Sequence, residues 1–410
     1  METTSNTFNG LGIAPALLDI LARLSYTSPT PIQHQAIPPA IEGKDVIGVA
    51  QTGTGKTLAF GIPLLQRLAQ SGGQGLVLLP TRELALQVEV ELHKIGVPFK
   101  LRTALLIGGL SMSNQVRMVK ASPHIIIATP GRLNDHLEEK SVKLDRVKII
   151  VLDEADRMLD MGFWPQVKRI IEVLPKERQT MLFSATLSKE IFDLAAKHMK
   201  LPTRIEVAPT GTTAEKVSQE FFIVRKEEKM RLLQKILGER AGSTIVFTRT
   251  KFGAKRVMQG VKAMGHHAAE IHSNRSLGQR REALDGFKNG RYRVLVATDI
   301  AARGIDVKGI ELVVNYDMPS QTEDYVHRIG RTARAGAEGH AITFAEPLQQ
   351  RDIRDIERLI RKSVQISKLP ELPPAKHVVM PFSSPRPHYS APHHRSGHPR
   401  QQGRPYRGGR

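Results

Sequence analysis

Two short segments contain the residue types of a site that binds and hydrolyses a nucleoside triphosphate. Residues 50–57 read AQTGTGKT, and residues 151–156 read VLDEAD. In the first segment, glycines allow a tight turn that aims backbone N–H groups at phosphate oxygens. Lys56 adds a positive charge for the β- and γ-phosphates, and the Thr57 hydroxyl can bind Mg²⁺. This segment therefore predicts a phosphate-binding loop, although the usual pattern begins with glycine where this chain has Ala50.

The second segment supplies carboxylates to the same site. An apolar run delivers Asp153 to the carboxyl edge of a predicted sheet, where open α/β folds bind ligands. Asp153 can hold Mg²⁺ through water, and Glu154 can orient and deprotonate the attacking water. Acids that oppose a helix dipole would explain one of the three carboxylates, but not all of them. The nucleotide contacts predicted in the first segment are Ala50, Gln51, Thr52, Gly53, Thr54, Gly55, Lys56 and Thr57.

The elements that position these residues follow from the hydrophobic pattern. Short apolar runs alternate with stretches of helical periodicity, such as 83–94 and 166–174. Runs that are apolar throughout are typical of strands buried on both faces, so the alternation predicts an α/β fold with parallel sheets. The predicted strands are 46–50, 75–79, 103–107, 124–128, 149–153 and 180–184, followed by 220–224, 244–248, 294–298, 312–315 and 340–344.

A polar stretch at 208–216 interrupts this pattern, which then starts again. We predict a nucleotide-binding domain at 1–207, a linker at 208–216 and a second α/β domain at 217–368. Residues 369–410 are rich in Pro, His, Gly and Arg. They cannot bury enough apolar area to offset the entropy of ordering, so a disordered basic tail is expected.

The net charge of +20 suggests a polyanionic partner. Residues 217–370 carry 28 Lys and Arg against 18 Asp and Glu, and the last forty residues carry 7 against 1. A solubilising surface would explain the charge equally well. The chain has no cysteine, no apolar run of ~18 residues and no secretion signal at its N-terminus, which favours a soluble protein of the reducing cytoplasm.

The spelling Asp153-Glu154-Ala155-Asp156, beside the phosphate loop, resembles the DEAD-box family of ATP-dependent RNA helicases. The resemblance covers about residues 8–365. It implies two tandem RecA-like domains, the core of superfamily 2 helicases, with ATP and Mg²⁺ as cofactors.

Residues 6–34 look like the family's adenine-reading motif, with YTSPTPIQ at 26–33. The resemblance implies that Gln33 pairs with the adenine edge and that Phe8 stacks on the ring. The family usually has glycine where this chain has Ser25, and we expect this change to matter little.

Other motifs of the resemblance imply contacts with the RNA backbone. They are strand ends and helix starts with hydroxyls, small residues and arginine, which suit phosphate and ribose contacts without base reading. The implied RNA contacts are Pro80, Thr81, Arg82, Gly108, Gly109, Thr129, Arg132, Thr248, Arg249 and Thr298. Ser184 and Thr186 resemble the segment that hydrogen-bonds Asp156 and couples the ATP state to RNA binding.

The second domain carries YVHRIGRTARAG at 325–336. Arg331 and Arg334 are three residues apart and can face one direction. The resemblance implies that both are arginine fingers for the γ-phosphate, whereas a solvated basic helix face is the alternative. It also implies nucleotide contacts at Gly304 and at Asp306, which would reach the ribose, and coupling residues at His327 and Arg328.

Two further departures from the family pattern lie in this domain. Ala333 replaces a glycine, so the turn that aims Arg334 can be tighter. Leu277 replaces a glutamine that links RNA motifs, while Arg280 is retained.

We therefore predict an enzyme, an RNA-stimulated ATPase that unwinds or remodels RNA duplexes and ribonucleoproteins locally and without sequence preference. A DNA helicase shares the ATPase motifs but not the adenine motif or the DEAD spelling. An ATP-gated RNA clamp or scaffold would keep every motif.

The short basic tail resembles that of the bacterial RhlE group and is expected to add weak RNA affinity. Family roles in ribosome assembly and RNA decay imply ribosomal subunits or RNA-degradation machinery as partners of a monomer, besides single-stranded and short duplex RNA.

Overall fold

The computed structural model describes residues 7–51, 53–96, 99–207, 217–302, 307, 309–333 and 339–374. Chain contacts divide the protein into the unit Met1–Pro373, which contains every element below, and the unit Pro374–Arg410, of which only Pro374 is described. The predicted linker at 208–216 and the tail beyond residue 374 lie outside the described residues.

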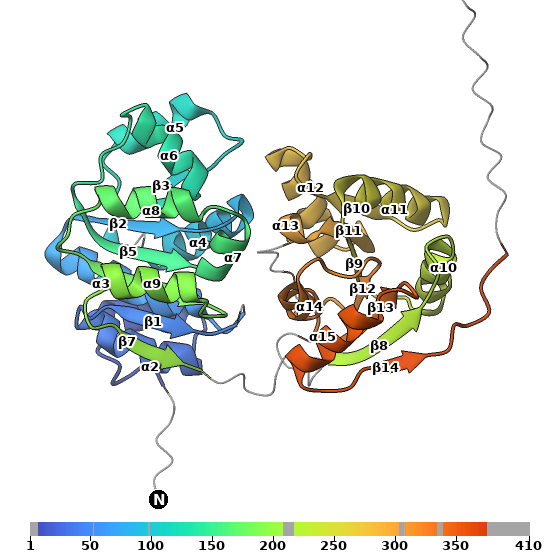
Figure 1. The fold of residues 1–410 in the computed structure, drawn as a ribbon. Coiled ribbons are helices and arrows are strands. Elements are labelled where there is room, and N and C mark those ends of the chain that lie inside the picture. The colour runs from blue at the N-terminus through green and yellow to red at the C-terminus, as the bar shows by residue number, and fades with distance from the viewer. Residues whose placement is uncertain are drawn as a thin grey trace, which may run out of the picture. The chain divides into compact units, whose positions relative to one another are not determined.

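The first half is built on a parallel sheet (Figure 1). In the described residues it has seven strands in the order β3-β4-β2-β5-β6-β1-β7. The strands are β1 (Val46–Val49), β2 (Gln74–Leu78), β3 (Thr103–Leu106), β4 (Ile125–Ala128), β5 (Val147–Asp153), β6 (Gln179–Ser184) and β7 (Thr203–Glu206). The helices are α1 (Pro15–Arg23), α2 (Pro31–Ile41), α3 (Lys56–Ser71), α4 (Arg82–Gly96), α5 (Met112–Lys120), α6 (Pro130–Glu138), α7 (Ala155–Asp160), α8 (Trp164–Val173) and α9 (Lys189–His198).

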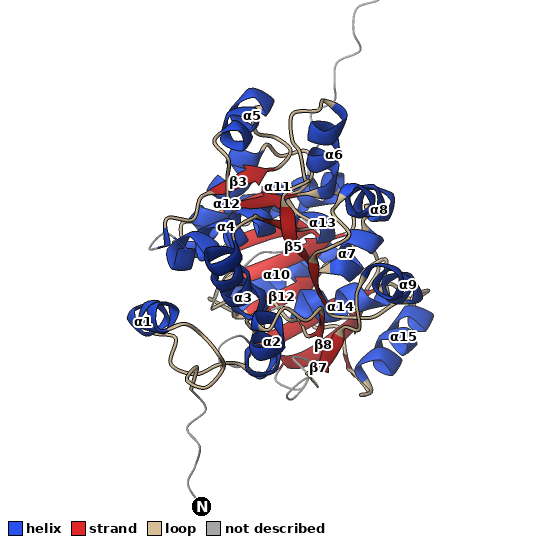
Figure 2. Cartoon of the chain, turned by 90° about the vertical axis from the view of Figure 1, so that its left-hand side faces the viewer, coloured by secondary structure: helices blue, strands red, loops and turns tan. Residues whose placement is uncertain are grey.

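Successive strand residues bury their side chains in two different hydrophobic clusters. Val151 of β5 joins the cluster that contains residues of α1 to α4, whereas Ile150 and Leu152 join the cluster that contains residues of α6 to α9. Figure 2 shows α3 and α4 on one side of β5, with α7, α8 and α9 on the other. Burial on both faces explains why these strands are apolar throughout.

The second half repeats this topology. Its parallel sheet has, among the described residues, the order β10-β11-β9-β12-β13-β8-β14, which equals the first order when the strands are numbered from β8. The strands are β8 (Val217–Ile223), β9 (Thr244–Thr248), β10 (Ala268–Ile271), β11 (Val294–Thr298), β12 (Leu312–Asn315), β13 (Gly339–Ala345) and β14 (Gln365–Ser367). The helices are α10 (Lys229–Glu239), α11 (Lys251–Ala263), α12 (Leu277–Lys288), α13 (Asp299–Ala302), α14 (Thr322–Ile329) and α15 (Gln350–Ile360).

The predicted α/β fold with two tandem parallel-sheet domains is confirmed. Every predicted strand is present within a few residues of its predicted bounds, and α4 and α8 occupy the two helical stretches. The strands β7, β10 and β14 were not predicted. No helix in the described residues is long and apolar enough to cross a membrane.

Candidate nucleotide and RNA sites

The predicted phosphate loop lies between β1 and α3. Gly53 and Gly55 have left-handed backbone conformations, with φ of 87° and 89°. Gly55 is also the N-cap residue of α3, and a Cβ atom there would lie 2.4 Å from Gln33 Nε2. Glycine alone meets both conditions without strain. The loop therefore leads the backbone into the N-terminus of α3, the end of a helix that attracts phosphate.

Other loop residues anchor this turn. The Ala50 N–H donates to the Ser184 carbonyl at 2.9 Å, which joins the loop to the end of β6. The Thr54 hydroxyl donates to the Gln51 carbonyl at 2.7 Å and closes the turn. Thr52 lies outside the described residues.

Lys56 opens α3, Asp153 ends β5, and their side chains meet. Lys56 Nζ lies 3.8 Å from Asp153 Oδ1, and both side chains are buried. Within the described part of the chain the ammonium has no hydrogen-bond partner. Burial of an ammonium that lacks hydrogen bonds is costly. Burial raises the pKa of Asp153 to about 6, against the opposing effect of Lys56. A phosphate and a cation are the ligands that would satisfy these two groups.

Glu154 is fixed by Arg157, a residue that the sequence reasoning missed. Glu154 is the N-cap residue of α7, with a left-handed φ of 54°, and it is 2% exposed. Arg157 Nη1 donates to Glu154 Oε2 at 2.8 Å, and both side chains are buried. The Glu154 N–H donates to Asp153 Oδ1 at 2.9 Å, so the two acids adjoin. The spacing of three residues within a helix start was the available signal for this pair.

Replacement of Arg157 by methionine is expected to lower the free energy of unfolding by about 3–5 kcal/mol, because it leaves the Glu154 carboxylate buried without its cation. Urea unfolding at neutral pH measures the change. Arg169→Met is the matched control, since Arg169 and its partner Glu138 are both exposed and 3.6 Å apart. An exposed pair contributes at most about 1 kcal/mol. Equal losses in the two variants would contradict a structural role for Arg157.

Asp156 is hydrogen-bonded to the segment that follows β6. Its Oδ2 accepts from the N–H groups of Ala185 and Thr186, both at 3.0 Å, and from the Thr186 hydroxyl at 3.3 Å. The Asp156 N–H donates to Ser184 Oγ at 3.2 Å. The contact that the resemblance implied between these motifs is therefore present in the structure.

The predicted adenine-reading residues are both buried. Gln33 Oε1 accepts from the Thr30 N–H at 2.9 Å, and Gln33 Nε2 donates to the Gly55 carbonyl at 3.0 Å. The Gln33 amide has two hydrogens and two oxygen lone pairs. These two bonds use one of each, so one hydrogen and one lone pair remain to pair with the adenine edge. Phe8 is 5% exposed and packs in the hydrophobic core. Ser25, which replaces a glycine, has a φ of 61°.

The predicted RNA contacts of the first domain gather at one sheet edge. The Arg82 guanidinium lies against Gly108 and Gly109, where an added Cβ would come within 2.8 Å and 2.6 Å of its nitrogens. Arg132 Nη1 donates to the Leu110 carbonyl at 3.1 Å. At the carboxyl ends of the adjacent strands β2, β4 and β3, or at the helix starts that follow, lie Pro80, Thr81, Arg82, Gly108, Gly109, Thr129 and Arg132.

The second domain brings Thr248 and Thr298 together, because they are partners in the register of β9 and β11. The Arg249 N–H donates to Asp317 Oδ2 at 3.1 Å, and Lys229 Nζ donates to Asp317 Oδ1 at 3.1 Å. Buried Lys229 was not predicted. It ties α10 to the end of the strand that carries the predicted RNA contacts.

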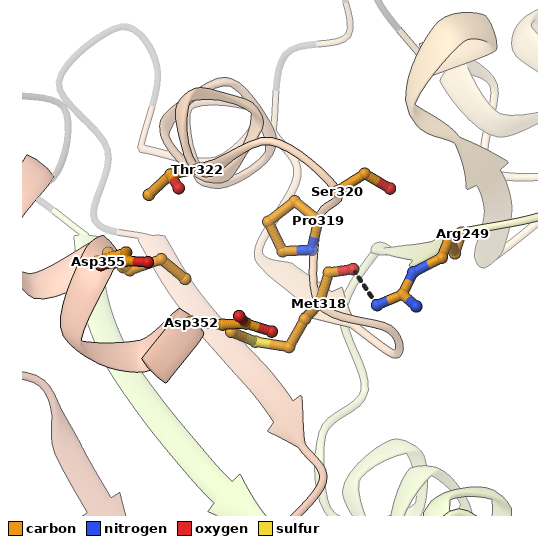
Figure 3. A pocket seen from close by; sticks show the side chains of 8 residues that line it. Arg249, Met318, Pro319, Ser320, Thr322, Asp352 and Asp355 are labelled. Atoms are coloured by element: carbon orange, nitrogen blue, oxygen red, sulfur yellow. Dashed lines mark hydrogen bonds between the residues drawn. The ribbon is translucent and has the colours of Figure 1, made fainter. Parts of the chain in front are cut away.

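The Arg249 side chain turns toward a pocket beside α14 and α15 (Figure 3). Its Nη2 donates to the Met318 carbonyl at 3.4 Å. Asp352 and Asp355 also line this pocket. Because two carboxylates oppose one arginine, the pocket does not suit a phosphate.

Of the predicted arginines of the second domain, Arg328 and Arg331 are both buried. Buried Arg328 forms a bidentate ion pair with Asp299, at 2.5 Å and 2.7 Å, and donates to the Asp317 carbonyl at 2.6 Å. It therefore has a structural role within this domain. Arg331 Nε donates to the His327 carbonyl at 3.1 Å. Among the residues outside the description are Gly304, Asp306 and Arg334.

The two remaining departures from the family pattern also have structural counterparts. Ala333 has a φ of 53°, a left-handed conformation that glycine adopts without strain. Leu277 opens α12 and packs against the cluster that contains residues of α1 to α4. The retained Arg280 forms a buried ion pair with Glu83, with 2.8 Å between Nη2 and Oε2.

Comparison with protein families matches residues 30–194 to the DEAD/DEAH box helicase family and residues 228–336 to the helicase conserved C-terminal domain. The chain is 42% identical over 384 residues to the ATP-dependent rRNA helicase RRP3 of Debaryomyces hansenii, covering 92% of this chain and 79% of that protein. It is 41% identical over 370 residues to the ATP-dependent RNA helicase CshA of Limosilactobacillus reuteri, covering 90% and 74%.

Solved structures agree with these matches. S. cerevisiae Dbp5 bound to RNA and ADP BeF3 superposes with a TM-score of 0.79 at 31% identity, covering 89% of this chain and 96% of that one. Mss116p bound to ssRNA and AMP-PNP gives a TM-score of 0.80 at 30% identity, covering 88% and 78%. The motifs, the repeated sheet topology and these relatives agree, and the chain belongs to the DEAD-box family of ATP-dependent RNA helicases.

Proposed function

We propose that hydrolysis of ATP by this helicase is carried out by Lys56, Asp153 and Glu154. The observation that carries the proposal is the buried Lys56 ammonium, which lacks a hydrogen-bond partner in the described chain and lies 3.8 Å from Asp153. Lys56 binds the β- and γ-phosphates, together with backbone N–H groups of the loop. Glu154 orients the attacking water and accepts its proton.

Mg²⁺ fits the same residues. No cluster of three acidic, histidine or cysteine side chains in the described residues could hold a metal alone. Mg²⁺ sites usually combine one or two carboxylates with substrate phosphates and water. Asp153, through water, and the Thr57 hydroxyl would hold the ion, which neutralises phosphate charge when bound.

The Mg²⁺ requirement is expected to increase at acid pH. The pKa of Asp153 is raised to about 6, so its carboxyl is mostly protonated at about pH 5 and ionised at about pH 8. A metal ligand must be deprotonated, so the Mg²⁺ concentration for half-maximal ATPase should rise as the pH falls through about 6. The Mg²⁺ affinity of free ATP, measured in the same buffers, corrects for the nucleotide's own protonation. A corrected requirement that does not change with pH would contradict the role of Asp153.

The strand ends of both domains bind the RNA backbone in this proposal. Asp156, hydrogen-bonded to Ser184 and Thr186, couples nucleotide state to RNA binding. Arg331 and Arg334 neutralise the charge that develops on the γ-phosphate. Recognition through phosphates and ribose hydroxyls gives selectivity for RNA without sequence preference.

Three assays of the purified chain test this function. ATPase stimulation by RNA is expected to exceed stimulation by DNA of the same sequence, and equal stimulation would favour a DNA helicase. Release of a strand from a short RNA duplex should require ATP. Retention of RNA in the presence of ATP without strand release would favour the clamp.

The substrate class and the location in the cell are also part of the proposal. The name of the relative RRP3 refers to ribosomal RNA, which supports a structured ribosomal RNA as one substrate class. A cytoplasmic location is proposed because a chain without cysteine suits a reducing compartment.

A further inference from the structure

The surface of α11 combines features that the motifs above do not use. This helix starts at the end of β9, directly after Thr248 and Arg249. Thr250 caps it, because its hydroxyl accepts from the Gly253 N–H at 3.0 Å. The first turn of α11 therefore adjoins the sheet edge at which Thr248 and Thr298 are paired.

One face of α11 is buried and the other is basic. Its buried residues Ala254, Val257, Met258 and Val261 join a hydrophobic cluster of the second domain. The exposed residues Phe252, Lys255, Arg256, Gln259 and Lys262 recur at helical spacing. The helix has no acidic residue along its length, whereas Lys251, Lys255, Arg256 and Lys262 give it four positive charges. Each of the other helices of this domain, α10 and α12 to α15, contains at least one acid.

Phe252, in the first turn of this helix, is a large aromatic side chain of which 74% is exposed. Lys251 Nζ lies 5.4 Å from the centre of its ring. An exposed aromatic ring among cations is the combination that single-stranded nucleic acids bind, since bases stack on the ring and phosphates contact the cations. A protein partner of comparable fit would need an acidic surface with an apolar centre.

We propose that the exposed face of α11, formed by Phe252, Lys255, Arg256, Gln259 and Lys262, is a further binding surface for single-stranded RNA. Phe252 stacks on one base, and the neighbouring cations contact the phosphates on either side. The proposal rests on the function proposed for Thr248 and Thr298, because α11 would bind the nucleotides that adjoin those held at the strand ends.

The test compares Phe252→Ala and the double variant Lys255→Gln/Arg256→Gln with the parent chain. RNA affinity is measured by fluorescence anisotropy with a nonhydrolysable ATP analogue, for single strands of about 5 and about 15 nucleotides. Loss of one stacked base should weaken binding of the long strand by about 5- to 100-fold for Phe252→Ala. The double variant should reduce the slope of log K against log salt by about 0.7 for each cation removed.

Phe192→Ala and Lys197→Gln are matched controls, because both residues are exposed on α9 of the first domain. They are expected to leave binding of both strands unchanged. The α11 variants should also leave ATPase stimulation by the short strand unchanged. Unchanged affinity for the long strand, or equal losses for both lengths, would overturn the α11 surface. Absence of RNA stimulation in the parent chain would instead overturn the proposed function itself. Preferential binding of an acidic protein without any effect on RNA would also overturn the assignment of RNA to α11.

Discussion

Glu154→Gln is expected to lower the rate of ATP turnover by about 10²–10⁴, the contribution of a positioned general base. Glutamine has the same shape but cannot accept the proton of the attacking water. ATP-dependent RNA binding should persist, because Lys56 and the strand-end residues are unchanged. Single-turnover hydrolysis measures the first effect, and RNA affinity with and without ATP measures the second.

The variant also tests whether Glu154 acts chemically or structurally. An amide oxygen can still accept the hydrogen bond from Arg157, which is 2.8 Å long in the parent. Urea unfolding should therefore show a smaller loss than in Arg157→Met. Glu138→Gln is the control, because Glu138 is exposed and its replacement should not affect turnover. Normal turnover in Glu154→Gln would remove this residue from the mechanism.

The central strands could be predicted from the sequence because both of their faces are buried. A run such as residues 149–152 is fully buried in the parallel sheet and has no polar interruption. The strands that were missed lack this pattern. β7 and β14 are short edge strands with mostly exposed or half-buried residues, and β10 contains the buried Glu270. Their pairing depends on neighbouring strands and not on local hydrophobicity.

The residues of the candidate site also differ in how far the local sequence predicts them. The motifs that lie within one short segment could be predicted from the sequence, because a phosphate loop, or several carboxylates at a strand end, has a sequence pattern of its own. The buried contact of Lys229 could not be predicted, because its partner Asp317 lies 88 residues away and no spacing rule connects them. The spacing of three residues between Glu154 and Arg157 was a usable signal, but Asp153 and Glu154 were interpreted only as contacts of the metal and the attacking water.

The glycine replacements show another limit of the sequence. Ser25 and Ala333 were recognised as departures, and both turn out to have positive φ. A left-handed conformation costs a residue with a side chain roughly 1–2 kcal/mol. Ser25 therefore carries a backbone strain that glycine would not have, which the expectation of little consequence left out.

Arg331→Lys should have the largest effect on the chemical step, a loss of about 10³–10⁵ in kcat if Arg331 stabilises charge on the γ-phosphate. Lysine keeps the positive charge but loses the planar fork of donors that matches phosphate oxygens. Affinity for ATP should change much less, because Lys56 and the loop supply ground-state binding. Kinetics with saturating RNA separate the two effects as a fall in kcat without a matching rise in KM.

Arg328→Lys is the control that separates this chemistry from stability. Arg328 is buried, with its guanidinium carbon 5.1 Å from the Phe247 ring centre and both carboxylate oxygens of Asp299 in contact. Its replacement should lower the free energy of unfolding. Arg331 is buried as well, so both variants are expected to lose some stability, and only Arg331→Lys should also lower kcat in the folded protein. Wild-type kcat in a folded Arg331→Lys protein would show that charge on the γ-phosphate is neutralised without this arginine.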